Sequence, residues 1–362
     1  MADSLLQTPL AGLHAEFSGR MVPFAGYAMP VQYPSGIMAE HNATRGGATL
    51  FDVSHMGQAI LEGPGAALAL ERATPADIDG LRIGRQRYLL LTIDDGGILD
   101  DAMCARLGPD RLFLVLNASR KHLDIPRIES LLPPGVTLTP WPDRALLAVQ
   151  GPKAAELLPS LAHLPFMGVA ETTLLGAEVI ATRSGYTGED GFEISVAADQ
   201  AEGFARRLLG LGITLAGLGA RDSLRLEAGL CLYGQDLDET TSPVEAGLTW
   251  TMGKRRRMAG DFPGADRVAR DLADGPPRRR VGLAIEGRQP ARAGTPIHLP
   301  DGEAIGIVTS GGFGPSVNAP VAMGYVPPAQ AVDGTALHLM VRGKPVLARV
   351  APLPFVPHRY IR

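Results

Sequence analysis

The chain comprises 362 residues, of which 45% are hydrophobic and 20% charged, and its formal net charge is -4. This length predicts two or three domains, and the composition is that of a globular protein. The negative charge argues against a nucleic-acid partner, and there is no apolar run of the roughly 18 residues that a membrane-spanning helix needs. Two widely separated cysteines and a start without an apolar signal segment predict a reducing, cytoplasmic location.

The first part of the chain is predicted to alternate short helices with strands. Apolar spacing indicates helices at residues 9–14 and 36–44 and strands at residues 58–61, 88–91 and 112–116. Between the second and third of these strands, Asp94, Asp95 and two glycines predict a tight hairpin turn, because glycine supplies the positive φ that such turns require.

Two segments of the chain, residues 58–67 and 146–155, have similar patterns. Each reads as an apolar strand, then Gly-Pro, then an alanine-rich helix. Proline fixes φ near the helical value, so Gly-Pro predicts a switch from strand to helix. The repetition predicts two α/β units of similar construction, one starting near residue 55 and the other near residue 145.

The second half of the chain predicts a further α/β segment, a linker and a β-rich end. Strands at 178–183 and 192–196 flank a glycine-rich loop, and helices follow at 200–209 and 223–228. Basic, glycine and proline residues at 253–280 predict a linker. Beyond it, strands at 281–285, 304–310, 322–326 and 336–341 predict a small β-barrel or sandwich.

The acidic pair Asp100 and Asp101 follows the predicted hairpin turn and has no explanation in turn chemistry. Aspartate is disfavoured in strands, and strand alternation directs two neighbouring side chains to opposite faces. At most one of the pair is therefore expected to point into a core or cleft. The residue types alone leave open a surface charge or a functional acid.

The roles of the other candidate residues are also undecided on the sequence alone. Residues 217–222 half-match a dinucleotide fingerprint, but Asp222 would repel a pyrophosphate there, which excludes a nicotinamide site. Arg221 fits either a surface ion pair or a ligand contact. Tyr186 lies in a glycine-rich loop that allows close approach to a ligand, and Glu193 is an unexplained acid on the next strand.

The basic run at residues 254–257 is predicted to be either a solvated loop or a patch for an acidic partner. His55 is expected to be structural. The sequence contains no zinc-protease motif, phosphate-binding loop, nucleophile elbow or Cys/His metal spacing, so no metal site is predicted.

Several motifs, in order along the whole chain, together resemble the glycine cleavage T-protein (aminomethyltransferase) family. They are TPL at 8–10, MVPFAG at 21–26, FDVSHM at 51–56, GGILDD at 96–101, GYTGEDG at 185–191, GARDSLRLEAG at 219–229, LYGQ at 232–235 and PFVP at 354–357. Segments 253–257 and 261–265 resemble the mitochondrial-type branch.

The resemblance implies an α+β fold with a three-domain, cloverleaf-like arrangement around a tetrahydrofolate pocket. Domain 1 would be discontinuous, with residues 1–54 and 143–255; domain 2 would be residues 55–142. Residues 276–362 would form a β-barrel or sandwich domain 3. The implied reaction moves a one-carbon unit from the aminomethylated lipoyl arm of the H-protein to tetrahydrofolate, with release of ammonia and formation of 5,10-methylenetetrahydrofolate.

The resemblance also assigns site residues. Asp100 matches the family's catalytic acid and would contact folate, and Tyr88, Glu193 and Arg221 match folate-binding positions. Further expected contacts to the folate co-substrate are Met56, Asn117, Tyr186 and Tyr360. A fixed carboxylate would stabilise the positive charge that develops on the transferred carbon, because it needs no reorganisation.

Two alternatives remain at this point. One is a folate-dependent demethylase of the same superfamily. The other is a folate-binding protein of iron–sulfur assembly or RNA modification, a branch that carries a Lys-Gly-Cys-Tyr-x-Gly-Gln-Glu motif. Cys231 falls at the motif's cysteine, but the preceding lysine is absent and Asp236 replaces the glutamate. Cys231 is then more simply a core residue.

Overall fold

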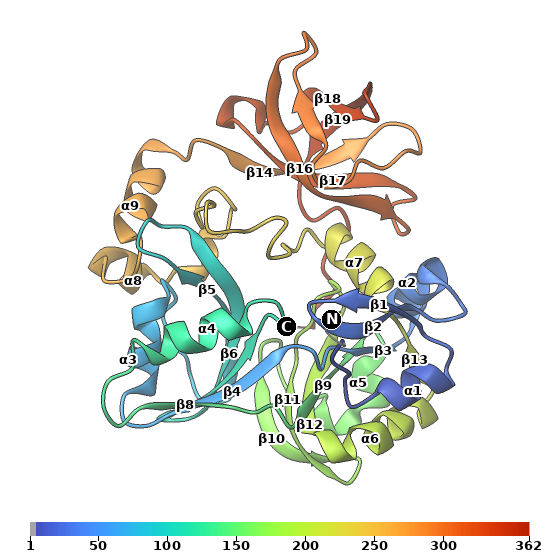
Figure 1. Cartoon of the computed structure of the whole chain (residues 1–362), viewed down its shortest axis with the longest axis vertical. Coiled ribbons are helices and arrows are strands. Elements are labelled where there is room, and N and C mark those ends of the chain that lie inside the picture. Colours follow the sequence, from blue (N-terminus) through green and yellow to red (C-terminus); the bar gives the residue numbers. More distant parts are fainter. Residues whose placement is uncertain (1–4, 362) are drawn as a thin grey trace.

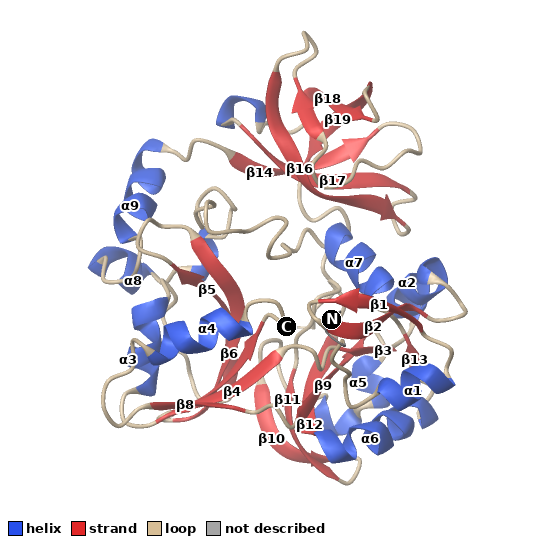
Figure 2. Cartoon of the chain, in the orientation of Figure 1, coloured by secondary structure: helices blue, strands red, loops and turns tan. Residues whose placement is uncertain are grey.

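The computed structural model describes residues 5–361, which form three lobes around a common centre (Figure 1). Two lobes are built on open sheets flanked by helices, and the third is a closed barrel (Figure 2). The α+β fold with a β-rich C-terminal part is therefore confirmed.

A six-stranded sheet forms the first lobe, in the order β10-β11-β12-β9-β3-β13. Its strands are β3 (Thr49–Asp52), β9 (Arg144–Gln150), β10 (Val169–Leu174), β11 (Ala177–Thr182), β12 (Gly191–Ala197) and β13 (Thr214–Leu215). Helices α1 (Ala11–Glu16), α5 (Ala154–Leu157) and α6 (Ala198–Gly210) belong to this lobe. Apolar residues of α1 and α6 pack on the sheet in one buried core.

A second, five-stranded sheet has the order β5-β6-β7-β4-β8. Its strands are β4 (Gly57–Glu62), β5 (Arg85–Thr92), β6 (Ile98–Gly108), β7 (Arg111–Leu116) and β8 (Thr137–Pro140). Helices α3 (Ala66–Leu70) and α4 (Lys121–Glu129) cover one of its faces. The hairpin predicted at residues 94–97 joins β5 to β6.

The repeated Gly-Pro pattern occurs at the end of β4 and of β9, and in both places a helix starts shortly afterwards. Gly63 has φ +124° and Gly151 has φ +135°. A Cβ atom would lie 2.1 Å from the Gly135 carbonyl oxygen in the first case and 2.2 Å from that of Gly47 in the second. The glycine is thus required at both switches by a close backbone approach, which adds to the effect of proline.

The third lobe is a closed barrel in the order β14-β17-β16-β15-β18-β19. The strands are β14 (Arg279–Ile285), β15 (Pro296–His298), β16 (Ala304–Gly314), β17 (Ala319–Val326), β18 (Ala336–Val341) and β19 (Lys344–Ala351). All four strands expected here are present, and β15 and β19, which the sequence analysis missed, complete the closure.

The remaining elements link the lobes. They are the hairpin of β1 (Arg20–Phe24) and β2 (Tyr27–Gln32), α2 (Ile37–Gly46), α7 (Leu218–Glu227), α8 (Lys254–Ala259) and α9 (Ala265–Asp274). Helix α7 lies between the first lobe and the barrel (Figure 1). The prediction of a plain linker at 253–280 is wrong, because α8 and α9 occupy much of it and bury Val268 and Phe262.

Candidate active site

Four predicted site residues lie next to one another and next to Asp101, and they come from both sheet lobes and helix α7. Tyr88 is on β5, Asp101 on β6 and Asn117 directly after β7, while Tyr186 comes from the loop before β12 and Arg221 from α7. All five side chains are half-buried. This partial exposure is what residues lining a cleft between lobes would show, and it contrasts with the fully buried cores beneath.

The hairpin before β6 is fixed by the chain segment that follows Cys231. Gly96 has φ +86°, and a Cβ on Gly97 would lie 1.7 Å from the carbonyl oxygen of Glu239. The Ile98 amide donates to the carbonyl oxygens of Asp238 (3.2 Å) and Thr241 (3.1 Å). The second glycine of the GGILDD motif is therefore dictated by this contact, and the contact fixes the position of the two aspartates that follow.

Asp100 and Asp101 face opposite sides of β6. Asp100 is 0% exposed and lies on the face that α4 covers, together with Ala102 and Cys104. Asp101 lies on the other face, where its side chain hydrogen-bonds with Tyr88. The opposite orientation expected from strand alternation is confirmed, but the expectation that at most one of the two side chains would enter a core or cleft is wrong, because Asp100 lies in the covered core and Asp101 lies among the site residues. The half-exposed face belongs to Asp101, whereas the family resemblance had assigned the catalytic role to Asp100.

Asn117 connects the two carboxylates. Its Nδ2 donates to Oδ1 of Asp100 at 2.9 Å, to Oδ1 of Asp101 at 2.9 Å and to the carbonyl oxygen of Asp101 at 3.1 Å. One amide at the end of β7 thus reaches both faces of the neighbouring strand. It holds the two acids in a fixed relation to each other.

Burial makes both aspartates weaker acids than usual. It raises the pKa of Asp100, and the nearby carboxylate of Asp124 adds to the effect. Burial and the charge of Asp100 raise the pKa of Asp101 to about 7, although hydrogen bonds with Tyr88 and Asn117 act in the opposite direction. A carboxyl group with a pKa near neutrality is suited to accept and return a proton.

Tyr88 stands between Asp101 and an exposed aromatic ring. Its ring stacks on Trp250 with centroids 5.7 Å apart and planes inclined by 24°. Trp250 is 66% exposed. A stacked aromatic pair that reaches from a half-buried acid to the surface provides a flat apolar wall for a planar ring.

Arg221 lies over the ring of Tyr186, with its guanidinium carbon 4.8 Å from the ring centroid. Its Nη1 is buried without a hydrogen-bond partner in the described chain. Burial lowers the pKa of Arg221, and the carboxylate of Glu193 opposes this. Burial also raises the pKa of Glu193, whose Oε2 accepts from Ser184 Oγ at 3.2 Å. The surface-ion-pair interpretation of Arg221 does not fit, because a buried donor here lacks a partner.

The other predicted residues lie at the margins. Met56 is half-buried and packs against the apolar cluster that contains Phe51 and Val53. His55 is buried, and its burial lowers the pKa to about 4, so the imidazole is neutral at physiological pH. Tyr360 stacks on Phe166 with centroids 4.3 Å apart. The folate contacts predicted for Met56 and Tyr360 stay predictions.

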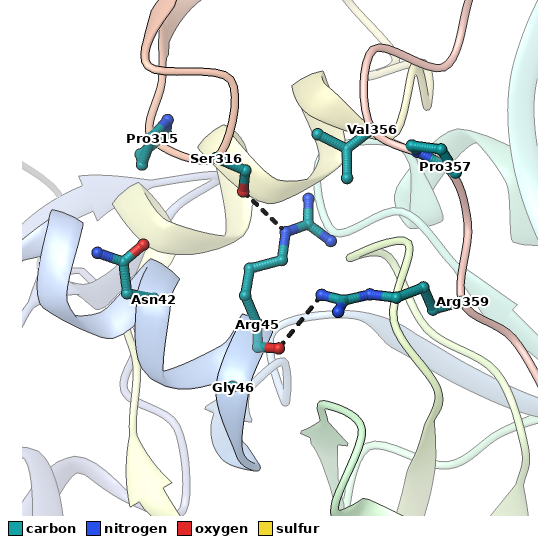
Figure 3. Close-up of a pocket in the computed structure, with 8 residues that line it drawn as sticks. All are labelled: Asn42, Arg45, Gly46, Pro315, Ser316, Val356, Pro357 and Arg359. Atoms are coloured by element: carbon teal, nitrogen blue, oxygen red, sulfur yellow. Dashed lines mark hydrogen bonds between the residues drawn. The ribbon is translucent and has the colours of Figure 1, made fainter.

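A separate hollow of about 640 Å³ lies between α2, a barrel loop and the C-terminal tail (Figure 3). Residues that line it are Asn42, Arg45, Gly46, Pro315, Ser316, Val356, Pro357 and Arg359. Arg45 Nε donates to Ser316 Oγ at 3.2 Å, and Arg359 Nη2 donates to the Arg45 carbonyl oxygen at 3.2 Å.

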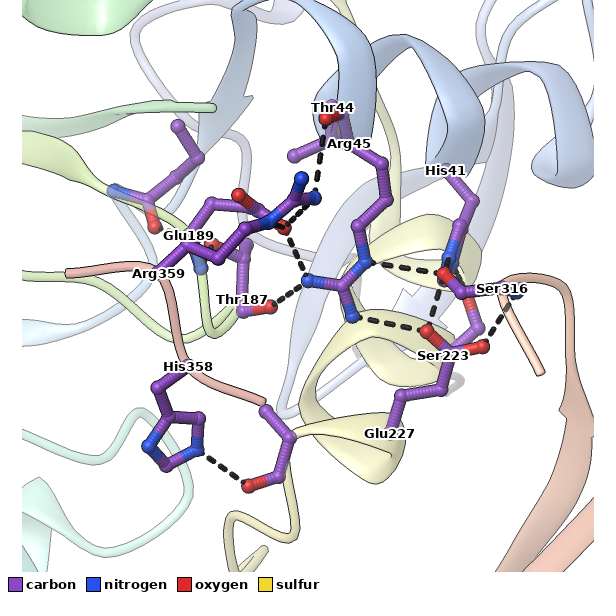
Figure 4. A network of polar contacts seen from close by, with 12 residues as sticks. His41, Thr44, Arg45, Thr187, Glu189, Ser223, Glu227, Ser316, His358 and Arg359 are labelled. Atoms are coloured by element: carbon purple, nitrogen blue, oxygen red, sulfur yellow. Dashed lines mark hydrogen bonds and ion pairs between the residues drawn. The ribbon is translucent and has the colours of Figure 1, made fainter. Parts of the chain in front are cut away.

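The arginines of this hollow belong to an ion-pair network that fastens the C-terminal tail to the first lobe (Figure 4). Arg45 contacts Glu189 at 2.6 Å and Glu227 at 2.9 Å. Arg359 contacts Glu189 at 2.5 Å, and His41 Nε2 lies 3.2 Å from Glu227. Because carboxylates neutralise both arginines, the hollow is explained as a structural junction.

The basic run at residues 254–257 forms helix α8 and is partly neutralised within the chain. Arg255 contacts Glu71 at 2.5 Å and Asp77 at 2.7 Å. Arg256 is buried and pairs with Glu71 and Asp261. Only the exposed members at 254 and 257 fit a patch for an acidic partner.

Cys231 is buried beside Leu90, Ile98 and Leu237. Burial raises the pKa of its thiol to about 12, so it carries no thiolate at neutral pH. Its carbonyl oxygen accepts a hydrogen bond from the Tyr186 hydroxyl. These contacts agree with the core role expected for it.

Residues 5–361 contain no group of three or more His, Cys, Asp or Glu side chains arranged for a metal ion. None of their helices is long and apolar enough to cross a membrane.

The fold and site define a multi-lobed protein with a carboxylate–arginine–aromatic centre and a C-terminal barrel. Residues 10–256 match the GCVT N-terminal domain, and residues 278–357 match the glycine cleavage T-protein C-terminal barrel domain. The chain belongs to the glycine cleavage T-protein family.

Individual relatives cover nearly its whole length. Mitochondrial aminomethyltransferases of Flaveria pringlei and Gallus gallus are 42% and 46% identical, over 99% of this chain and 91% and 94% of theirs. The crystal structure of the glycine cleavage system aminomethyltransferase T from Bartonella henselae has a TM-score of 0.95 and 44% identity, covering 99% of this chain and all of that one.

Asp124 is a site residue that sequence reasoning missed. It lies in the first turn of α4, 0% exposed, and faces Asp100. Acidic residues in the first turn of a helix are common because they complement the helix dipole, so its position alone gave no signal. Only the packing of α4 against β6 brings Asp124 beside Asp100, the carboxylate to which Asn117 donates.

Proposed function

We propose that the chain is an aminomethyltransferase that transfers a one-carbon unit from the aminomethylated lipoyl arm of the H-protein to tetrahydrofolate, releasing ammonia and forming 5,10-methylenetetrahydrofolate. Family membership and full-length similarity to aminomethyltransferases support this function over the demethylase and the iron–sulfur or RNA-modification alternatives. The observation that carries it is the meeting of the Asp101 and Arg221 side chains around Tyr88 and Tyr186.

The residues present fit a reduced folate. The pyrimidinone ring of a reduced pterin is planar and carries ring N–H donors and a carbonyl oxygen, and it would bring acceptors within reach of the unpartnered Nη1 of Arg221. Tyr88 and Tyr186 offer ring faces, and the carboxylates of Asp101 and Glu193 offer acceptors. Asn117, Met56 and Tyr360 are proposed as further contacts. Tetrahydrofolate supplies the nitrogen nucleophiles that accept the transferred carbon.

The two aspartates are proposed to act together in the transfer. Positive charge develops on the transferred carbon as its bond to the leaving group breaks, and a fixed carboxylate stabilises that charge. Asp100 is the catalytic acid that the family resemblance implies, and we propose that Asp101, on the half-exposed face, makes the direct contact. The pKa of Asp101, raised to about 7, allows its carboxylate to take a proton from an attacking amine.

The domain division is proposed as residues 1–54 with 143–255, residues 55–142, and residues 276–362. It is supported by the pairing of β3 with β9 in one sheet, although the whole second sheet lies between them in sequence. A cytoplasmic location remains a proposal, and the relatives named above are mitochondrial proteins.

Turnover tests the proposal directly. The purified chain, aminomethylated H-protein and tetrahydrofolate are mixed and ammonia release is followed. No release with partners that support a known T-protein would refute the function.

Two isosteric variants test the assignment of the carboxylates. Asp101→Asn is expected to lower kcat by about 100-fold or more. Asp100→Asn is expected to lower it by about 10-fold, because Asp100 lies on the covered face of β6 and affects the site through Asn117. Asp199→Asn, on an exposed first turn of α6, serves as the control and should match the parent chain. A larger loss in Asp100→Asn than in Asp101→Asn would make Asp100 the contacting group. Unchanged turnover in both would exclude carboxylate catalysis.

A further inference from the structure

Asp124 and Asp100 form a buried pair of acids behind the site. Asp100 lies on β6 and Asp124 on α4, both side chains are 0% exposed, and they lie within hydrogen-bonding reach of each other. The proposed transfer chemistry uses Asp100 and Asp101 and gives no role to Asp124.

The hydrogen-bond donors around the pair do not suffice for two carboxylates. Asn117 Nδ2 satisfies Oδ1 of Asp100. Within the described chain, Oδ2 of Asp100 and both carboxyl oxygens of Asp124 are buried without a partner. Ionised carboxylates only accept hydrogen bonds, so two of them face to face leave these oxygens unsatisfied. One proton on Oδ2 of Asp100 turns that group into a donor and gives Asp124 a partner.

The other charges around the pair fit a single remaining negative charge. Arg120, at the start of α4, favours an ionised Asp124, while its guanidinium also donates to the Leu99 carbonyl oxygen at 3.1 Å. Asp101 adds negative charge from the far side of β6, and Tyr233 is the nearby phenol. Arg120 also pairs with Glu239 at 2.6 Å. One cation thus faces four carboxyl groups, which favours protonation of at least one of them.

We propose that Asp100 and Asp124 share one proton at neutral pH, and that this pair positions Asn117 and, through its amide, the carboxylate of Asp101. The positioning role rests on the proposed aminomethyl transfer, whereas the shared proton does not. Asp124 is thus a positioning residue.

The arrangement makes a prediction for alkaline pH. When the shared proton is lost, two adjacent carboxylates repel each other, and Oδ2 of Asp100 loses its donor role. Asn117 bonds to both Asp100 and Asp101, so a displacement of Asp100 alters the position of Asp101. Turnover should then fall as the pair ionises.

Infrared spectroscopy of the full chain tests the shared proton without any activity measurement. The carbonyl stretching band of a protonated carboxylic acid is compared between the parent and Asp124→Asn at neutral pH. The asparagine amide donates to Asp100 and makes protonation unnecessary, so one band should be lost. Asp100→Asn should lose it as well and serves if Asp124→Asn does not fold. Asp199→Asn, an acid at an exposed helix start, should keep it. Retention of the band in both site variants would overturn the shared proton.

The pH profile of kcat tests the positioning role. The parent should lose activity at alkaline pH, and Asp124→Asn should lack this alkaline limb while its KM for tetrahydrofolate stays within about twofold. A purely structural role would lower kcat by the same factor at every pH, and that result would overturn the positioning role. If the parent shows no turnover with competent partners, the proposed function fails, and the infrared comparison still decides the shared proton.

Discussion

The replacement Glu227→Gln tests the ion-pair network that holds the C-terminal tail. The Glu227 carboxylate is 0% exposed and accepts from Arg45 and from the Ser316 amide, the latter at 2.7 Å. Burial alone would raise its pKa, but hydrogen bonds from His41 and Ser316 and the nearby positive charges outweigh this and lower it from 4.5 to about 2. At neutral pH this corresponds to about 3 kcal/mol of folding stability.

The sign of the pH dependence follows from the lowered pKa. The stabilisation is fully present above the unfolded-state pKa of 4.5 and is lost as the pH falls through the folded-state value of about 2. Glutamine cannot ionise, so the variant lacks this contribution. The difference in unfolding free energy between parent and variant should be about 3 kcal/mol at pH 7 and about half of that at pH 3.

Urea unfolding at both pH values, followed by circular dichroism and tryptophan fluorescence, measures the difference. Glu16→Gln is the control: Glu16 pairs with Arg206 at 2.5 Å, but on the surface, where ion pairs contribute little. It should match the parent at both pH values. An equal loss of stability in Glu227→Gln at pH 7 and pH 3 would refute the argument, because the loss would then come from packing.

Two further predictions concern the hairpin and the basic helix. Gly97→Ala should lower the free energy of unfolding by about 3 kcal/mol, because the added Cβ would collide with the Glu239 carbonyl oxygen. Gly210→Ala is the control and should be tolerated, because a Cβ there meets nothing within 4 Å. Equal thermal denaturation midpoints for the two variants would contradict this prediction. Arg257→Ala should weaken H-protein association mainly at low ionic strength. Arg255→Ala should change the association less, because Arg255 is already paired with Glu71 and Asp77. Equal salt dependence of the two variants in titration calorimetry would refute a docking role for Arg257.

The sequence determined much of the fold because local periodicity reports burial directly. The strands of the barrel, helices α2 and α6, and the hairpin before β6 are encoded in apolar spacing and turn residues. The family resemblance likewise pointed to a set of site residues that the fold brings toward one centre from both sheets and α7, namely Tyr88, Asn117, Tyr186, Glu193 and Arg221. Their roles stay proposals, but their proximity is a finding.

The tertiary structure decided what depends on contacts distant in sequence. Strand alternation required Asp100 and Asp101 to face opposite sides, but only the placement of α4 shows that Asp100 is on the covered side. Asp124 gained its proposed positioning role only through its contact with Asp100. In the same way, the basic run at 254–257 resembled a charged patch until Glu71 and Asp77, from another lobe, were found beside Arg255.

The GGILDD hairpin shows most clearly which features follow from the local sequence and which follow from tertiary contacts. Turn chemistry explains Gly96, because a positive φ is a local property of the chain. Gly97 is needed because the carbonyl oxygen of Glu239 occupies the space of a side chain, which no local pattern reveals. Neighbouring residues determine the local conformation of the chain. The environment of a carboxylate depends on the segments that pack against it, which only the folded structure shows.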